Sequence, residues 1–345
     1  MKRIISLLLI VVFALSTVSC GAVNKTEVAV LWHNMADEFT AELADAVDRA
    51  MYIENIKYSH YDAEGNADTQ IAQAKAAIEA GAPALLVNCE TSGTAAAIIG
   101  LASDADIPVV FIGSNITASV LDTYAKCVSV ELDYYSLYTV LAEKIAADLI
   151  ENYDDYDRNG DGKISYTAYG LSGECVPEIN ELLRAEEKAE LVMVENNPTV
   201  SVTESINALF AGYDGSGKTV NETPVELILT DDDAIIEEML IALRAYQLNF
   251  EKLVTHFIPL YTVGTAANAG NLLVYAEKQE ERDAYSVMNA IDNGYLSAAA
   301  REDDDTLAES AARILRNLLK GKDTFTKIDE DLIVGKKISV KYTIY

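Results

Sequence analysis

The chain lacks the motifs on which most enzyme active sites are built. It has 3 histidines and 4 cysteines in 345 residues, with no HExxH motif and no CxxC pair. A GxxxxGK[ST] phosphate loop, a GxGxxG turn after the first strand and a GxSxG nucleophile turn are also missing. The Gly-Ser-Gly-Lys-Thr run at 215–219 lacks the first glycine and the preceding strand of a phosphate loop, so we interpret it as a turn. We therefore predict that the protein is not an enzyme.

Basic residues are also scarce. The chain has 26 Lys and Arg against 55 Asp and Glu, which gives a net charge of −29 and a sequence pI near 4.3. Such a chain repels the phosphate backbone of nucleic acids, so a nucleic-acid partner is not expected. The acidic excess is spread along the chain and indicates a solvated surface rather than an acidic tail.

Only the N-terminus has a long apolar run. Lys2 and Arg3 precede the apolar segment 4–15, and small residues then lead to Cys20 and Gly21. This is typical of a secretory signal and is short for a membrane span. It resembles the bacterial lipoprotein signal, in which the cysteine is diacylated, although Thr17 stands where that family usually has leucine. We expect a signal peptide at 1–20, a tether at 21–26 and a lipid anchor as the only membrane contact. Ordinary secretion with cleavage nearby is the alternative.

The other cysteines are few and scattered. Cys89, Cys127 and Cys175 are an odd number, and two of them lie in or beside apolar runs. Small buried core residues are the interpretation we favour over catalysis or metal binding, while a disulfide stays open.

The mature chain alternates short apolar runs with amphipathic helical stretches. About 320 residues remain after the leader, which fits two domains of ordinary size. We expect strands at 28–32, 56–60, 84–88, 108–112, 127–130, 164–169, 190–194, 226–230 and 257–263, with helices between them. Val/Ile/Leu-rich strands that alternate with helices predict an α/β fold of two doubly wound parallel-sheet lobes. Ligands bind such sheets beyond the carboxyl ends of the strands.

A possible calcium loop lies in the middle of the chain. In the segment 157–165, side-chain oxygens stand at positions 1, 3, 5 and 9, Gly162 is at position 6, and the Lys163 carbonyl can serve at position 7. This is the EF-hand ligand spacing. Position 12 is Ala168 instead of the bidentate glutamate, so either the site is weak or a carboxylate arrives from elsewhere. A solvated turn is the alternative.

These residues resemble one family over nearly the whole mature chain. The chain is similar to the bacterial galactose/glucose-binding proteins, the extracytoplasmic receptors of sugar ABC transporters, which have the type I periplasmic-binding fold. The resemblance is carried by Asp37 and Phe39 after the first strand, by the segments 80–88 and 107–111, and by the calcium loop. Residues 225–233 and 318–329 match as well.

The resemblance implies a complete metal site. In this family a distant strand supplies the final carboxylate, and the matching residue is Glu226. The implied Ca²⁺ shell consists of Asp157, Asn159, Asp161, the Lys163 carbonyl, Ser165 and Glu226. We expect this site to be structural.

The resemblance also implies a sugar site in a cleft between the lobes. The residues that match its ligand set, or lie close to it, are Asp37, Phe39, Asn115, Glu174, Asn180, Asp232 and Glu302. Only Asp37 and Phe39 match the family in kind, as a hydroxyl acceptor and a stacking face. An N-cap and core packing are their respective alternatives. Acceptors dominate the set, which leads to the hypothesis of a ligand rich in donors, such as an amino sugar.

The expected organisation is lobe 1 at 27–130 plus about 303–332, and lobe 2 at 131–302 plus about 333–345. The implied function is an exported, lipid-anchored, monomeric solute-binding protein that delivers a monosaccharide such as galactose or glucose to ABC permease subunits. The alternative is a chemosensory or signalling receptor of the same fold for a non-hexose ligand. A sugar-responsive repressor is disfavoured, because the export signal occupies the place of its DNA-binding helices.

Overall fold

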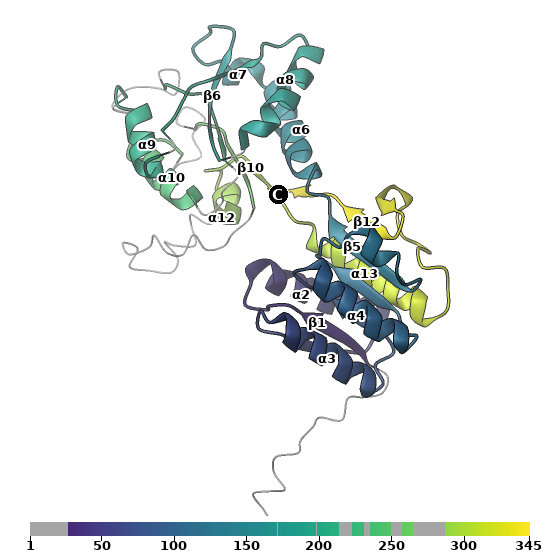
Figure 1. Ribbon diagram of the computed structural model, residues 1–345. Coiled ribbons are helices and arrows are strands. Elements are labelled where there is room, and N and C mark those ends of the chain that lie inside the picture. The colour runs from purple at the N-terminus through teal and green to yellow at the C-terminus, as the bar shows by residue number, and fades with distance from the viewer. Residues whose placement is uncertain are drawn as a thin grey trace, which may run out of the picture. The chain divides into compact units, whose positions relative to one another are not determined.

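The computed structural model describes residues 27–170, 172–197, 199–213, 223–230, 235–249, 257–264 and 287–345 (Figure 1). The predicted leader, Cys20, the turn at 215–219 and Asp232 lie outside these residues. The chain divides into two compact units. Unit 1 consists of the described residues up to Leu132 together with Asp304–Val340, and unit 2 consists of Asp133–Asp303 with Lys341–Tyr345.

Unit 1 is built on a seven-stranded sheet in the order β11-β12-β5-β4-β3-β1-β2. Every pairing is parallel except the β11–β12 hairpin. The strands are β1 (Val28–Trp32), β2 (Tyr58–Asp62), β3 (Leu85–Val87), β4 (Val109–Ile112), β5 (Cys127–Leu132), β11 (Ile333–Val334) and β12 (Lys337–Val340). All residues of β1, β3 and β4 are buried. This explains their continuous apolar sequences, because helices cover both faces of the sheet.

The helices of unit 1 form two layers. They are α2 (Glu38–Glu54), α3 (Ala67–Glu79), α4 (Ser92–Asp104), α5 (Ala118–Leu121) and α13 (Asp304–Leu319), with a short 3₁₀ turn η5 (Glu330–Leu332). α13 packs along α2 and against β4 and β5, while α3 packs on α4 and β1. Figure 1 shows α13 in yellow-green beside these early elements. Asp37, Asn66 and Thr91 cap the amino ends of α2, α3 and α4 with side-chain oxygens.

Unit 2 is built on a six-stranded sheet in the order β13-β10-β9-β8-β6-β7, in which only β13 runs antiparallel to its neighbour. Its strands are β6 (Ile164–Tyr169), β7 (Leu191–Met193), β8 (Leu227–Thr230), β9 (Leu260–Val263), β10 (Ala298–Arg301) and β13 (Thr343–Ile344). The helices are α6 (Ser136–Glu151), α7 (Tyr153–Tyr156), α8 (Val176–Ala185), α9 (Val202–Leu209), α10 (Ile236–Arg244) and α12 (Val287–Asp292), with a 3₁₀ turn η1 (Ser172–Cys175). α6 and α8 pack in one core cluster, and α9, α10 and α12 contribute to the other.

Two expectations from the sequence need correction. Residues 333–340 were assigned to the second lobe, but β12 pairs in parallel with β5 inside unit 1, and only residues 341–345 belong to unit 2. The second strand begins at Tyr58 rather than at residue 56, because α2 ends only at Glu54 and Asn55 closes it in the left-handed conformation. The parallel two-unit α/β architecture itself is confirmed.

Within the described residues, no helix combines the length and the apolar character that a membrane crossing requires. Cys89, Cys127 and Cys175 are all buried free thiols, in agreement with their interpretation as core residues.

Candidate functional site

The carboxyl ends of β1, β2, β3 and β4 form one edge of the unit 1 sheet and hold the best-defined part of the predicted ligand set. Asp37 follows β1 and caps α2, because its Oδ1 accepts hydrogen bonds from the Thr40 amide and the Thr40 hydroxyl, both at 3.0 Å. Both bonds use Oδ1, and Oδ2 accepts no hydrogen bond from a described residue. The capping alternative is therefore correct, and the second oxygen is still available to a ligand.

Phe39 lies against the turn that follows β4. A side chain at Gly113 would meet the Phe39 ring at 3.1 Å and Leu43 at 2.9 Å, so only glycine leaves room for the ring here. Gly113 also has a φ of +57°, which other residues rarely adopt. Asn115 is exposed two residues further on. The structure thus brings the aromatic ring of Phe39 to the loop that carries Asn115.

Hydrogen bonds fasten the loops of this edge to one another. Asp62, the last residue of β2, accepts from the Met35 amide at 3.2 Å and so holds the loop between β1 and Asp37. Asn88 donates to the Ile112 carbonyl at 3.2 Å. The Ser114 hydroxyl accepts from the Cys89 amide at 2.8 Å. The edge is therefore a preorganised surface rather than a set of independent loops.

A histidine–carboxylate pair on the same edge was not anticipated from the sequence. His33 comes directly after β1, and its Nε2 lies 3.3 Å from Oε2 of Glu90, which follows β3. Glu90 is 69% exposed, whereas His33 is 18% exposed. β1 and β3 are neighbours in the sheet, so the parallel register predicts that residues after the two strands meet. The position of both residues immediately after apolar runs is the signal that could have identified them.

The predicted ligand residues of unit 2 are placed differently. Glu174 is exposed in η1 after β6, and Glu302 is half-buried after β10, so both follow strands of the six-stranded sheet at their carboxyl ends. Burial and the charge of Glu302 raise the pKa of Tyr342. Asn180 instead accepts a hydrogen bond from the Leu191 amide at 2.8 Å, at the first residue of β7. That placement gives Asn180 a structural role away from the other two residues.

The predicted calcium loop meets Glu226. This carboxylate is 2% exposed at the start of β8, and its Oε1 accepts from the Arg158 amide at 2.9 Å and the Asn159 amide at 3.3 Å. Its Oε2 accepts from the Ser165 amide at 2.9 Å and the Ser165 hydroxyl at 3.1 Å. Glu226 therefore holds the loop through four hydrogen bonds from a position far along the chain.

The other loop oxygens turn inward. Asp157 accepts from the amides of Asp161 and Gly162, and Asn159 accepts from the Asp161 amide at 2.8 Å. The Asp161 carboxylate accepts from the Lys163 amide at 2.9 Å. Gly160 and Gly162 take positive φ angles of 70° and 79°, which the tight winding requires. Each of these loop oxygens accepts only one of the bonds and keeps a second lone pair for a cation, whereas each Glu226 oxygen already accepts two bonds.

The fit to a hard cation depends on the whole oxygen set. Among the described residues, no group of three or more His, Cys, Asp or Glu side chains is arranged to hold a metal ion by itself. Besides the carboxylates, a cation at this loop would need the side-chain oxygen of Asn159, the hydroxyl oxygen of Ser165 and the backbone carbonyl oxygen of Lys163. Oxygen-only ligation of that kind suits Ca²⁺ and disfavours zinc.

Two similar solved structures with TM-scores of 0.50 and 0.52 support the fold. A Brachyspira murdochii protein, described as an ABC transporter and LacI family transcriptional regulator, is 13% identical. Its TM-score is 0.52 over 92% of this chain and 93% of that one. A periplasmic sugar-binding protein from Pseudomonas fluorescens is also 13% identical, with a TM-score of 0.50 over 93% and 86%. A glucose-galactose binding protein from Geobacillus stearothermophilus is 13% identical, with a TM-score of 0.48 over 93% and 98%.

No curated protein sequence matches the chain. The family model described as periplasmic binding protein domain, by contrast, matches residues 28–323, which include the strands β1 to β10 and the loop at 157–165. The two parallel-sheet units and this match lead to one conclusion: the chain belongs to the periplasmic binding protein family.

Proposed function

We propose that this protein is an extracytoplasmic receptor that binds a small hydroxylated solute of the sugar class for an ABC transporter. Membership of the periplasmic binding protein family supports a solute-binding role. The similar fold of a sugar-binding protein from Pseudomonas fluorescens supports the ligand class. The observation that carries the proposal is the free Asp37 oxygen on the same sheet edge as the Phe39 ring, because sugars are held by hydroxyl acceptors and aromatic faces.

The ligand that we expect is a monosaccharide related to galactose or glucose, bound at the carboxyl ends of the strands. The excess of acceptors in the predicted set keeps a donor-rich ligand, such as an amino sugar, as the competing proposal. Isothermal titration with galactose, glucose and a panel of amino sugars separates the two. Tight galactose binding would refute the donor-rich alternative, and no binding of any sugar would refute the ligand class.

Asp37 offers a sharp test, because its capping and ligand roles can be separated. Asn caps helices as well as Asp does, so Asp37→Asn keeps the α2 cap but replaces one acceptor oxygen by an NH₂ group. We expect an unchanged melting temperature and a sugar Kd raised about tenfold to a hundredfold, the cost of losing a hydrogen bond to a charged group. Asp37→Ala, the matched control, should lower both stability and affinity. If Asp37→Asn binds sugar like the wild type, Asp37 is only a cap.

We further propose that the loop at 157–165 and Glu226 bind a structural Ca²⁺ ion. The meeting of the Glu226 carboxylate with the loop supports this proposal. Glu226 would supply the bidentate carboxylate that the loop lacks at its twelfth position, exchanging some of its four hydrogen bonds for contacts with the ion. Binding of the ion would stabilise unit 2 by linkage, since only the folded chain brings Glu226 to the loop.

We also propose that the chain is exported, carries a lipid on Cys20 and works as a monomer with ABC permease subunits. The basic and apolar leader followed by Cys20 supports export and anchoring. Mass spectrometry of the protein isolated from membranes tests the anchor, since a diacylated N-terminal cysteine adds a defined mass. A signalling receptor is the alternative outcome, which a transport assay on intact cells would reveal as ligand binding without uptake.

A further inference from the structure

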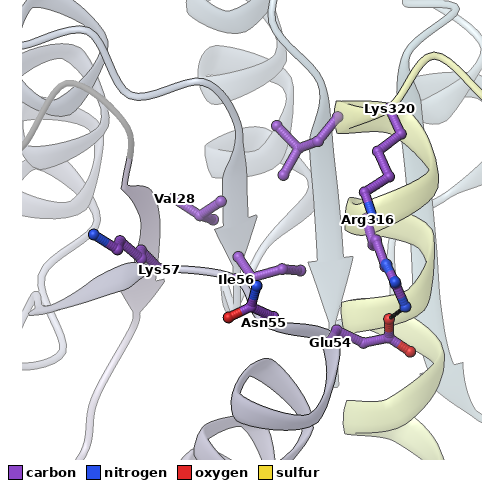
Figure 2. Close-up of a pocket in the computed structure, with 8 residues that line it drawn as sticks. Val28, Glu54, Asn55, Ile56, Lys57, Arg316 and Lys320 are labelled. Atoms are coloured by element: carbon purple, nitrogen blue, oxygen red, sulfur yellow. Dashed lines mark hydrogen bonds and ion pairs between the residues drawn. The ribbon is translucent and has the colours of Figure 1, made fainter.

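A pocket of about 400 Å³ opens at the amino ends of the unit 1 strands, on the opposite edge of the sheet from the candidate ligand residues. It is lined by Val28, Glu54, Asn55, Ile56, Lys57, Arg316, Leu319 and Lys320. Figure 2 shows Arg316 on α13, Lys320 just beyond the carboxyl end of α13, and Lys57 in the segment between α2 and β2. The lining combines an apolar floor with basic groups, which is unusual in a chain with a net charge of −29.

The charges of this pocket leave a positive excess. Glu54 is 5% exposed and forms ion pairs with Arg313 and Arg316, so its charge is neutralised inside the structure. Lys57 and Lys320 are exposed, and neither forms an ion pair with any residue that the structure describes. Arg313 and Arg316 share the single negative charge of Glu54, which leaves one positive charge over. Together with the unpaired ammonium groups of the two lysines, this excess favours an anion.

Exposed apolar residues stand beside the pocket-lining residues in the sequence. Tyr52 is 86% exposed and Ile53 is 66% exposed in the last turn of α2, directly before the lining residue Glu54. Leu319, which lines the pocket, is 38% exposed at the end of α13. An aromatic ring, aliphatic side chains and lysines together are the composition of surfaces that sit at the level of lipid headgroups.

The path of the chain places this surface near the membrane. Val28 lines the pocket and opens β1, so the tether enters unit 1 beside it. Seven residues separate Cys20 from Val28, and the eight Cα-to-Cα steps between them span at most about 28 Å when fully extended. This step depends on the proposed lipid anchor, which would hold the amino-end edge of unit 1 close to the bilayer surface.

We propose that the pocket surface, defined as Tyr52, Ile53, Lys57, Leu319 and Lys320, docks on anionic phospholipid headgroups through its two lysines. The net negative charge of the chain opposes this contact only weakly at physiological ionic strength, because charges beyond about 8 Å from the bilayer are largely screened. Docking would hold unit 1 against the bilayer surface by its amino-end edge.

The test uses the chain from residue 21 onward without lipid. It is sedimented with vesicles of equal parts phosphatidylglycerol and phosphatidylcholine, and with vesicles of phosphatidylcholine alone. We expect binding only to the first. Lys57→Ala and Lys320→Ala should each weaken it roughly fivefold, since a lysine near an anionic surface contributes about that factor. Lys75→Ala, a control on α3, should leave binding unchanged, because Lys75 is exposed, pairs with Glu79 and lies away from the pocket.

Several results would overturn the proposal. Equal binding to the two kinds of vesicle would do so, and so would an equal loss of binding in the Lys75→Ala control. A lowered melting temperature of Lys320→Ala with intact vesicle binding would show that Lys320 only stabilises the end of α13. Calorimetric binding of glycerol 3-phosphate without vesicles would assign the pocket to a soluble anion. Tyr52→Ser with Ile53→Ser should reduce the binding that persists at high salt. Sugar titration and mass spectrometry on the same preparations report separately on ligand binding and on the anchor.

Discussion

Glu226→Gln is the substitution that best separates a metal ligand from a purely structural clasp. The carboxylate is 2% exposed and accepts four hydrogen bonds, two on each oxygen, from Arg158, Asn159 and Ser165. Glutamine has the same shape but turns one oxygen into an NH₂ group, which must face two donors. Two hydrogen bonds to a charged acceptor are thus lost, and their donors are left unpaired in a buried place.

The expected loss follows from these contacts. A hydrogen bond to a charged group contributes about 1.5 to 3 kcal/mol, so two of them amount to roughly 3 kcal/mol at the lower end. For a unit of this size, 1 kcal/mol corresponds to about 2 to 4 °C, which predicts a melting temperature lowered by roughly 6 to 12 °C. Calcium at a hundred times its Kd would add about 2.7 kcal/mol to the wild type alone.

The assay is differential scanning calorimetry of both proteins in excess CaCl₂ and in excess EGTA. The wild type should melt lower in EGTA, whereas Glu226→Gln should melt lower in both solutions and respond little to the chelator. Glu181→Gln, which removes the same charge from an exposed position on α8, should behave like the wild type. If chelation leaves the wild type unchanged while Glu226→Gln is destabilised, Glu226 acts as a clasp through hydrogen bonds and the calcium proposal fails. If Glu226→Gln melts like the wild type, the reasoning from the four hydrogen bonds is itself wrong.

Three further predictions concern other parts of the molecule. Asp37→Ala should lower the free energy of unfolding by about 1 kcal/mol in urea titrations, because α2 loses its cap. Burial raises the pKa of Glu237, and its Oε1 has no hydrogen-bond partner among the described residues. The ionised carboxylate therefore lowers the free energy of unfolding as pH rises above the ordinary pKa of a glutamate. Glu237→Gln should raise the melting temperature near pH 7, and this gain should fade in acid. Burial also raises the pKa of Cys89 and Cys127 to about 12, so a thiol reagent should label them only after unfolding; fast labelling of the folded protein would contradict their burial.

Most of the fold could be predicted from the sequence because the strands are buried on both faces. β1, β3 and β4 appear as continuous apolar runs, and their observed bounds differ from the predicted ones by a residue at most. β2 is half-buried at every position, so it has no such run, and its start was predicted two residues too early. Residues 333–340 carry a pattern that suits either sheet, and only the parallel pairing of β12 with β5 decides between them.

The candidate sites divide in the same way. The loop at 157–165 is a local pattern and was predictable from spacing, whereas its link to Glu226 needed the family resemblance, because it depends on strand order. The contact of His33 with Glu90 and the pocket between α2 and α13 were missed for that reason. Pairs of residues that are distant in sequence meet only once the order of the strands is known.

The interleaved path of the chain has a consequence for how the protein is made. In unit 1, β12 pairs with β5 and α13 packs along α2, yet both elements follow residues 133–303 of unit 2 in the sequence. During synthesis, unit 1 therefore stays incomplete until nearly the last residue has left the ribosome. Until then, Glu54 lacks both of its arginine partners, and β5 lacks its neighbour β12. A late-finishing sheet of this kind keeps the polypeptide unfolded for longer, which is the state that a secretion channel accepts.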